Sequence, residues 1–103
     1  KYIATDYKEL DITDDKSLKV FFEINKDITH IINCAAYNDV DKAENDEKVW
    51  LLNSEAPKKL SEISKEMGAV FVTYSTDFVF EGKKKSPYVE EDKTNGISEY
   101  GKS

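Results

Sequence analysis

Two nearly continuous apolar stretches interrupt an otherwise polar chain. They cover residues 30–36 (HIINCAA) and 69–74 (AVFVTY). A strand that is covered by helices on both faces of a parallel sheet shows this continuous pattern, whereas a half-exposed strand alternates between apolar and polar residues. We therefore predict two buried parallel strands at these positions. A shorter apolar run at residues 2–5 (YIAT) indicates a further strand.

Two segments between these runs have the periodicity of amphipathic helices. In the first, the apolar residues Leu18 and Phe22 lie on one face. Thr13 or Asp14 can cap the start of this helix through a side-chain oxygen, because both residue types accept hydrogen bonds from free backbone N–H groups. The pattern ends near Asn25, which predicts a helix of about three turns.

The second helical segment extends from about residue 46 to residue 67. Its apolar residues are spaced by three or four positions and comprise Val49, Leu52, Ala56, Leu60, Ile63 and Met67. Gly68 follows directly and readily adopts the left-handed conformation that ends a helix. Pro57 lacks a backbone donor, so we expect the helix to kink or divide there.

The order of these elements predicts the fold class. Strand, helix, strand, helix and strand in succession build a parallel sheet with right-handed connections, which is an α/β fold. A chain of 103 residues suffices for one domain with one modest core. We therefore expect residues 1–103 to form a single Rossmann-like, doubly wound domain, in which ligands bind beyond the carboxyl ends of the strands.

The charge balance and the single cysteine limit the partners and the compartment. The chain has 15 basic residues against 21 acidic ones and a net charge of −6. Such a chain repels phosphate backbones and anionic lipid headgroups, so we expect neither nucleic acid nor a membrane as a partner. Cys34 cannot form an internal disulfide and is expected to be a buried, unreactive side chain. Without a signal-peptide pattern or a run of ~20 apolar residues, the cytoplasm is the expected location.

Residues with hydroxyl groups follow the second apolar stretch. Ser75, Thr76 and Asp77 come directly after it, and Tyr100 follows Thr76 by 24 positions, across a loop at residues 81–98. A hydroxyl group at a strand end can hydrogen-bond a substrate carbonyl, while a tyrosine on the next helix can deliver the proton that the reduced carbonyl needs. Taken alone, Ser75, Thr76 and Asp77 are more typical of a cap or a turn. The separation of 24 positions between Thr76 and Tyr100 favours a nicotinamide-dependent carbonyl reductase.

The first apolar stretch ends in the small residues Ala35 and Ala36, followed by Tyr37. Small side chains let another molecule approach the backbone closely, but they equally make room for a following helix. Both interpretations stay open from this segment alone. His30, the only histidine, has no identifiable partner for triad or metal chemistry.

Three segments together resemble a known family. They are residues 33–44 (NCAAYNDVDKAE), 74–82 (YSTDFVFEG) and 100–103 (YGKS). Their combination is similar to the dTDP-4-dehydrorhamnose reductases, which belong to the extended short-chain dehydrogenase/reductases. The resemblance covers nearly the whole chain. The first two segments are more specific to this family than the tyrosine motif, which the whole superfamily shares.

The resemblance implies roles for individual residues. Thr76 would be the catalytic hydroxyl that holds the keto oxygen, Asp77 would contact the sugar, and Tyr100 would be the catalytic proton donor. The residues implied for cofactor binding are Asp11 and Ile12 beside the adenine, Ala35, Ala36 and Tyr37 along the dinucleotide, and Tyr100.

The same resemblance implies a reaction. It is the reduction of dTDP-4-dehydrorhamnose to dTDP-rhamnose, with NADPH or NADH as hydride donor and a dTDP-sugar as the partner. Members of the family are often homodimers that need Mg²⁺. We find no recognisable metal-ligand set in this sequence and assign no metal ligands.

Two features of the family are absent from the sequence. None of its four glycines opens a helix after a first strand, so the glycine-rich turn that binds a pyrophosphate is missing. The lysine expected four positions after Tyr100 would fall one position beyond Ser103. We therefore expect a partial domain, an interior piece of a longer reductase that lacks the first strand and the C-terminal substrate lobe and is inactive alone.

The missing first strand has a consequence for the sheet. In a doubly wound sheet of order 3-2-1-4-5 that strand is central. Without it, the strand near Ile3 is separated from the strand near Ile32, and two sheet edges are left unpaired.

Two alternatives to a reductase stay open. An epimerase or dehydratase of the extended family would have the same fold, although residues 75–80 (STDFVF) favour a reductase. A non-catalytic binding or regulatory module, resembling the regulatory subunit of methionine adenosyltransferase, would share the scaffold without the activity. Sugar-dependent oxidation of NADPH distinguishes an enzyme from such a module.

Overall fold

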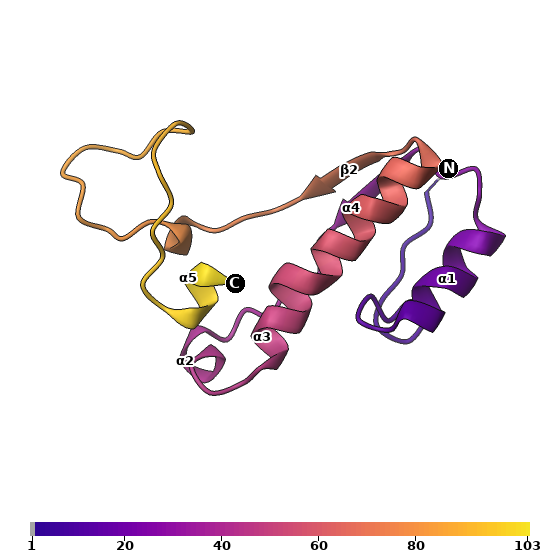
Figure 1. Cartoon of the computed structure of the whole chain (residues 1–103), viewed down its shortest axis with the longest axis horizontal. Coiled ribbons are helices and arrows are strands. Elements are labelled where there is room, and N and C mark those ends of the chain that lie inside the picture. The colour runs from indigo at the N-terminus through magenta and orange to yellow at the C-terminus, as the bar shows by residue number, and fades with distance from the viewer. Residues whose placement is uncertain (1) are drawn as a thin grey trace.

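The computed structural model describes residues 2–103, so Lys1 of the predicted domain lies outside the described part. Its elements in chain order are α1 (Asp15–Ile24), β1 (His30–Asn33), α2 (Val40–Ala43), α3 (Lys48–Trp50), the π-helical turn η1 (Leu51–Glu55), α4 (Ala56–Met67), β2 (Val70–Thr73), the 3₁₀ turn η2 (Asp77–Val79) and α5 (Glu99–Lys102). Helices α1 and α4 lie beside the strands, and the loop before α5 projects from the other end of the molecule (Figure 1).

The two apolar stretches pair in one parallel sheet, as predicted, but the prediction that both strands are buried is wrong, because most of their side chains are exposed or half-exposed in the described residues. Strand β1 pairs with β2 in a register that joins His30 to Val70 and Asn33 to Thr73. Both strands are shorter than the apolar runs. The Asn33 side chain donates to Thr73 Oγ1 at 3.3 Å and accepts from Ala35 N at 3.1 Å, and this turn takes the backbone away from its neighbour.

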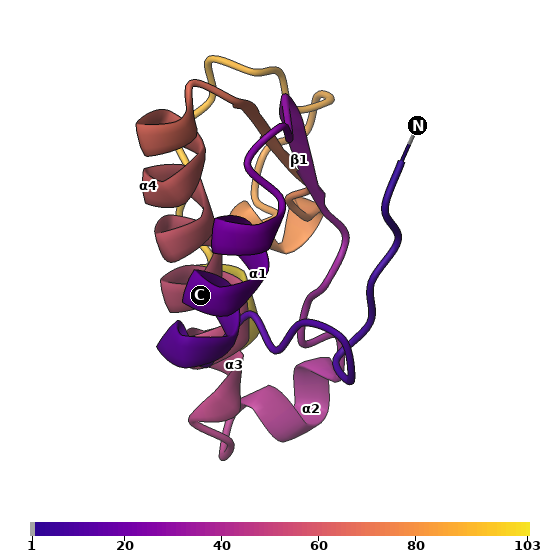
Figure 2. The same ribbon diagram turned by 90° about the vertical axis from the view of Figure 1, so that its right-hand side faces the viewer.

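The predicted strand at residues 2–5 is wrong. This segment is extended but unpaired and exposed, with Tyr2 89% and Ile3 52% accessible. A cavity of about 700 Å³ lies between it and β1, and Figure 2 shows the two running past each other without meeting. The expected separation of Ile3 from Ile32 is therefore confirmed, and a strand without a partner has no ladder of hydrogen bonds to hold it.

Helix α1 forms at the predicted place and supplies half of the core. Asp14 caps it by accepting from Lys16 N at 3.2 Å and Ser17 N at 3.1 Å. Leu18 and Phe22 are buried, and they pack against the buried Leu60 of α4. The core of the described chain therefore lies between these two helices and the sheet.

The long helical segment begins at α3 and ends where predicted. Gly68 closes it with a φ of 68°, and its N–H donates to the carbonyl groups of the last turn. The predicted division at Pro57 takes the form of the π-helical turn η1, in which Ala56 N donates to Leu51 O. Proline cannot donate to Asn53 O, and a wider turn just before it accommodates the missing bond.

The described chain leaves much of its apolar surface uncovered. Its accessible surface is 7953 Å², whereas a compact monomer of this mass exposes about 5,900 Å². The radius of gyration is 15.5 Å, against about 13 Å for a compact domain of this length. Ile32, Val70 and Val72 of the sheet are exposed. Within residues 2–103, no helix combines the length and the apolar character that a membrane crossing requires.

Candidate functional site

Thr76 begins the turn η2 just beyond the carboxyl end of β2. Its Oγ1 accepts from Phe78 N at 3.3 Å and donates to Asp77 Oδ1 at 3.3 Å. These bonds fix the turn and leave the Thr76 side chain half-buried at its start. The hydroxyl group is therefore held at the strand end, where ligands of an α/β sheet bind.

Tyr100 lies on α5, and α5 packs directly on η2. The rings of Phe78 and Tyr100 have centroids 5.5 Å apart and are inclined at 78°, an edge-to-face contact. Ser98 caps α5 by accepting from Gly101 N at 3.0 Å. The structure thus brings the segments of Thr76 and Tyr100 together across the long loop.

The close packing of α5 on η2 depends on glycine. A Cβ atom on Gly101 would lie deep inside van der Waals contact of the Phe78 carbonyl oxygen, and one on Gly96 would collide with the backbone of Gly101. Both glycines therefore stand where three backbone segments stack on one another.

Gly101→Ala should displace α5 and with it Tyr100. Because its neighbour is backbone and cannot rotate away, we expect the free energy of unfolding to fall by about 1–3 kcal/mol and turnover to fall with it. Thermal unfolding and turnover of the full-length polypeptide that contains this sequence measure both effects.

Gly82→Ala is the matched control for Gly101→Ala. A Cβ atom at Gly82 meets nothing within 4 Å, although φ is 73° there. It should cost stability through backbone strain alone and leave turnover unchanged. Equal losses of turnover in both variants would contradict the packing account.

Apart from Tyr100, the residues implied for cofactor binding divide into two groups. Asp11, Ile12 and Ala35 line the cavity of about 700 Å³ between the N-terminal segment and β1. Ala36 is exposed beyond it, and Tyr37 is half-buried where the chain leaves the sheet. The structure therefore places the first group on one cavity and the second outside the lining of that cavity.

Asp11 is held in place by its neighbours. Its Oδ1 accepts from Thr13 N at 2.9 Å and from Thr13 Oγ1 at 2.7 Å, and its own N–H donates to Ser17 Oγ at 3.0 Å. The hydrogen bonds from Thr13 lower the pKa of the Asp11 carboxyl group. An ionised acceptor therefore stands beside the cavity, suited to ligand hydroxyl or amine groups.

Tyr37 is fixed through both its backbone and its ring. Its N–H donates to Asn53 Oδ1 at 2.8 Å, and its carbonyl group accepts from Asn53 Nδ2 at 3.1 Å. Its hydroxyl group donates to Asp46 Oδ2 at 3.0 Å. Burial and this bond to Asp46 raise the pKa of the Tyr37 phenol, so it remains a neutral donor.

Sequence reasoning missed three residues that support the site. Asn53 of η1 also donates to Ser103 Oγ at 3.2 Å and so links Tyr37 to the end of α5. Glu44 Oε1 accepts from Glu99 N at 2.9 Å, and Trp50 Nε1 donates to Glu99 Oε2 at 3.2 Å. The one local signal is the polar Asn53 within the predicted helix, four positions before Pro57.

The prediction that Cys34 is buried is wrong. The structure shows it exposed and as a free thiol. Cys34 follows β1 and lines the cavity beside the N-terminal segment, which leaves its side chain open to that cavity.

The cavity matches only part of a dinucleotide. Asp11 and Ile12 supply polar and apolar contacts of the kind an adenosine needs. A pyrophosphate needs several backbone N–H groups at a glycine-rich turn, and no glycine of residues 2–103 lines this cavity. Across the same residues, no group of three His, Cys, Asp or Glu side chains is arranged to hold a metal ion, so the implied Mg²⁺ has no support here.

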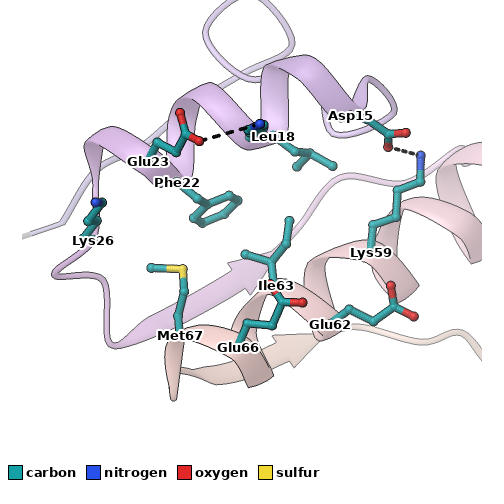
Figure 3. Close-up of a pocket in the computed structure, with 11 residues that line it drawn as sticks. Asp15, Leu18, Phe22, Glu23, Lys26, Lys59, Glu62, Ile63, Glu66 and Met67 are labelled. Atoms are coloured by element: carbon teal, nitrogen blue, oxygen red, sulfur yellow. Dashed lines mark hydrogen bonds and ion pairs between the residues drawn. The ribbon is translucent and has the colours of Figure 1, made fainter.

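A second cavity lies away from all of these residues. Figure 3 shows this groove of about 600 Å³ between α1 and α4. Leu18, Phe22, Ile63 and Met67 contribute apolar surface, and charged side chains such as Asp15 and Lys59 pair across it. No residue implied for catalysis or cofactor binding lines it, so we do not assign it to the site.

Comparison with known proteins gives consistent matches over the chain. The model of the family described as RmlD substrate binding domain matches residues 1–103. A dTDP-4-dehydrorhamnose reductase of Burkholderia thailandensis is 46% identical over 74 residues, which are 71% of this chain and 25% of that protein.

Two solved structures are similar to the whole described fold. A dTDP-4-dehydrorhamnose reductase of Clostridium acetobutylicum superposes with a TM-score of 0.92 at 40% identity, over 97% of this chain and 36% of that one. The enzyme of the same name from Bacillus anthracis, solved in complex with NADP, has a TM-score of 0.92 at 31% identity, over 99% of this chain and 36% of that one. The chain therefore spans between 25% and 36% of the length of these relatives.

Proposed function

This chain belongs to the family of the RmlD substrate binding domain, and from that premise we propose that it forms part of an NAD(P)H-dependent reductase of a dTDP-4-keto-6-deoxy sugar. The observation that carries the proposal is the docking of α5 on η2, which puts Tyr100 beside the turn that begins at Thr76. The names of the similar proteins, and the NADP in one of their structures, support it.

The proposed roles follow from the chemistry of each group. The Thr76 hydroxyl exchanges its long bond to Asp77 Oδ1 for a hydrogen bond to the keto oxygen, and Tyr100 donates the proton that the oxygen takes up as it becomes an alcohol. Asp77, which follows Thr76 directly, contacts hydroxyl groups of the sugar. The dinucleotide supplies hydride when it is bound.

The cofactor residues belong to the same proposal. Asp11 and Ile12 stand at the adenine side, Ala35, Ala36 and Tyr37 follow the dinucleotide from the end of β1, and the Tyr100 phenol reaches its nicotinamide end. Residues 1–103 would then be part of one dinucleotide-binding, Rossmann-like domain of the short-chain dehydrogenase/reductase type. We also propose a homodimer in a reducing cytoplasm, where the exposed Cys34 stays a thiol.

The proposed activity is tested in the full-length polypeptide that contains this sequence. Oxidation of NADPH or NADH is followed with dTDP-4-dehydrorhamnose and, as a control, with the same sugar without its nucleotide. We expect oxidation that depends on the dTDP-sugar. Cofactor binding without any turnover would instead favour the non-catalytic module, and absence of both would overturn the proposal.

A further inference from the structure

A hydrogen bond between distant segments holds the start of α5. Glu44 directly follows α2, and its Oε1 accepts from the backbone N–H of Glu99 at 2.9 Å, across 55 positions of sequence. Glu99 is the first residue of α5 and the neighbour of Tyr100. The Glu44 carboxylate therefore satisfies a donor that a helix start leaves without an intrahelical partner.

Helix α5 depends on such outside contacts for its position. It has four residues, and isolated helices this short do not persist in water. Trp50 Nε1 and Lys102 Nζ bond to the two oxygens of the Glu99 carboxylate, at 3.2 and 3.0 Å. The bonds from Lys102 and then Trp50 lower the pKa of Glu99, so this carboxylate stays ionised at neutral pH.

Helix α2, which carries Glu44 at its end, also has four residues and is held by a cap and by burial. Asp39 caps it by accepting from Lys42 N at 3.2 Å and pairs with Lys42 Nζ at 2.6 Å. Ala43 is buried, with 2% of its surface accessible. The run Val-Asp-Lys-Ala-Glu that marks the sequence thus folds into a short, capped helix that delivers one carboxylate to α5.

We propose that Glu44 is a positioning residue that sets the Tyr100 phenol relative to Thr76. The proposal rests on the proposed reductase function and adds a role for the Val-Asp-Lys-Ala-Glu run. Glu44 acts through the Glu99 N–H and the angle of α5, and it is not among the residues that line the cofactor-side cavity. Its loss should therefore slow proton transfer far more than it weakens cofactor binding.

The test compares Glu44→Ala with Glu44→Gln in the full-length polypeptide. Displacement of a reacting group by about 1 Å can cost up to 10²-fold, so Glu44→Ala should lower kcat by about 10- to 100-fold and change KM for NADPH far less. Glu44→Gln should restore most of kcat, because its amide oxygen accepts the same N–H. Glu47→Ala, a nearby glutamate without a capping bond, should match the unmodified protein.

Hydrogen exchange keeps this test independent of turnover. In Glu44→Ala, the amides of residues 99–103 should exchange faster while those of α4 are unchanged, and Glu44→Gln should restore protection. Unchanged exchange and unchanged kcat in Glu44→Ala would overturn the proposal, as would equal damage by both variants. If the unmodified protein has no turnover, the reductase assignment fails, and exchange alone then decides whether Glu44 holds α5.

Discussion

Tyr100→Phe should lower the turnover of the full-length polypeptide by about 100- to 10,000-fold, the usual contribution of a positioned acid. The substitution removes only the hydroxyl group. The ring should keep its edge-to-face contact with Phe78, so neither α5 nor the fold has reason to move. Turnover with dTDP-4-dehydrorhamnose measures the loss, and a titration with NADPH should show a far smaller change in affinity, because only one of the proposed cofactor contacts is removed.

Tyr88→Phe is the matched control for this substitution. The Tyr88 ring stacks on Phe80 with a centroid distance of 4.2 Å, within the long loop. Among the described residues, its hydroxyl group accepts from Lys84 N alone, at 3.3 Å, so turnover should hardly change. Turnover of Tyr100→Phe close to that of the control would remove Tyr100 from the mechanism.

The second large effect concerns residues 1–103 as an isolated polypeptide. We expect no measurable binding of NADPH, because no glycine of residues 2–103 lines the cavity beside Ala35 and a pyrophosphate would find no cradle of N–H groups there. We also expect no cooperative thermal transition. Calorimetry with and without NADPH tests both expectations, with the full-length polypeptide as the positive control.

We expect no cooperative transition because the sheet has only two strands in the described residues and is partly uncovered. Two strands alone are marginal in water unless other elements cover them. Helix α4 contacts both strands, but Ile32, Val70 and Val72 remain exposed, and their burial would contribute much of the hydrophobic stabilisation. A sharp transition together with NADPH binding by the isolated chain would show that residues 1–103 form a complete domain.

Local patterns in the sequence were enough for α1, for the helical segment from α3 to α4 and for the pairing of the two strands, but they did not indicate the short helix α2. The cap at Asp14, the stop at Gly68 and the break near Pro57 each depend on the chemistry of one residue and its immediate neighbours. The apolar run at residues 2–5 carries the same kind of signal. It failed as a strand because pairing needs a second chain segment at hydrogen-bonding distance, which no local pattern reports.

For the site, the sequence indicated the residues that belong to a local motif but not the contacts between distant residues. Thr76 and Tyr100 were found because their residue types and spacing match a known motif, and the structure brings their segments together. The bond between Glu44 and Glu99 joins residues 55 positions apart, and the bond between Asn53 and Ser103 joins residues 50 positions apart. Cys34 was misjudged because its burial depends on elements that would cover the end of β1.

The central claim is that Thr76 and Tyr100 act on one carbonyl group. It is tested most directly by turnover in a double-mutant cycle of Thr76→Val and Tyr100→Phe, with Thr76→Ser as the variant that keeps both the hydroxyl and its bond to Phe78 N. Groups that act as a unit show strongly non-additive losses. We predict that the double variant is about as slow as the slower single variant. Losses that simply multiply would show that the two residues act independently and contradict the account.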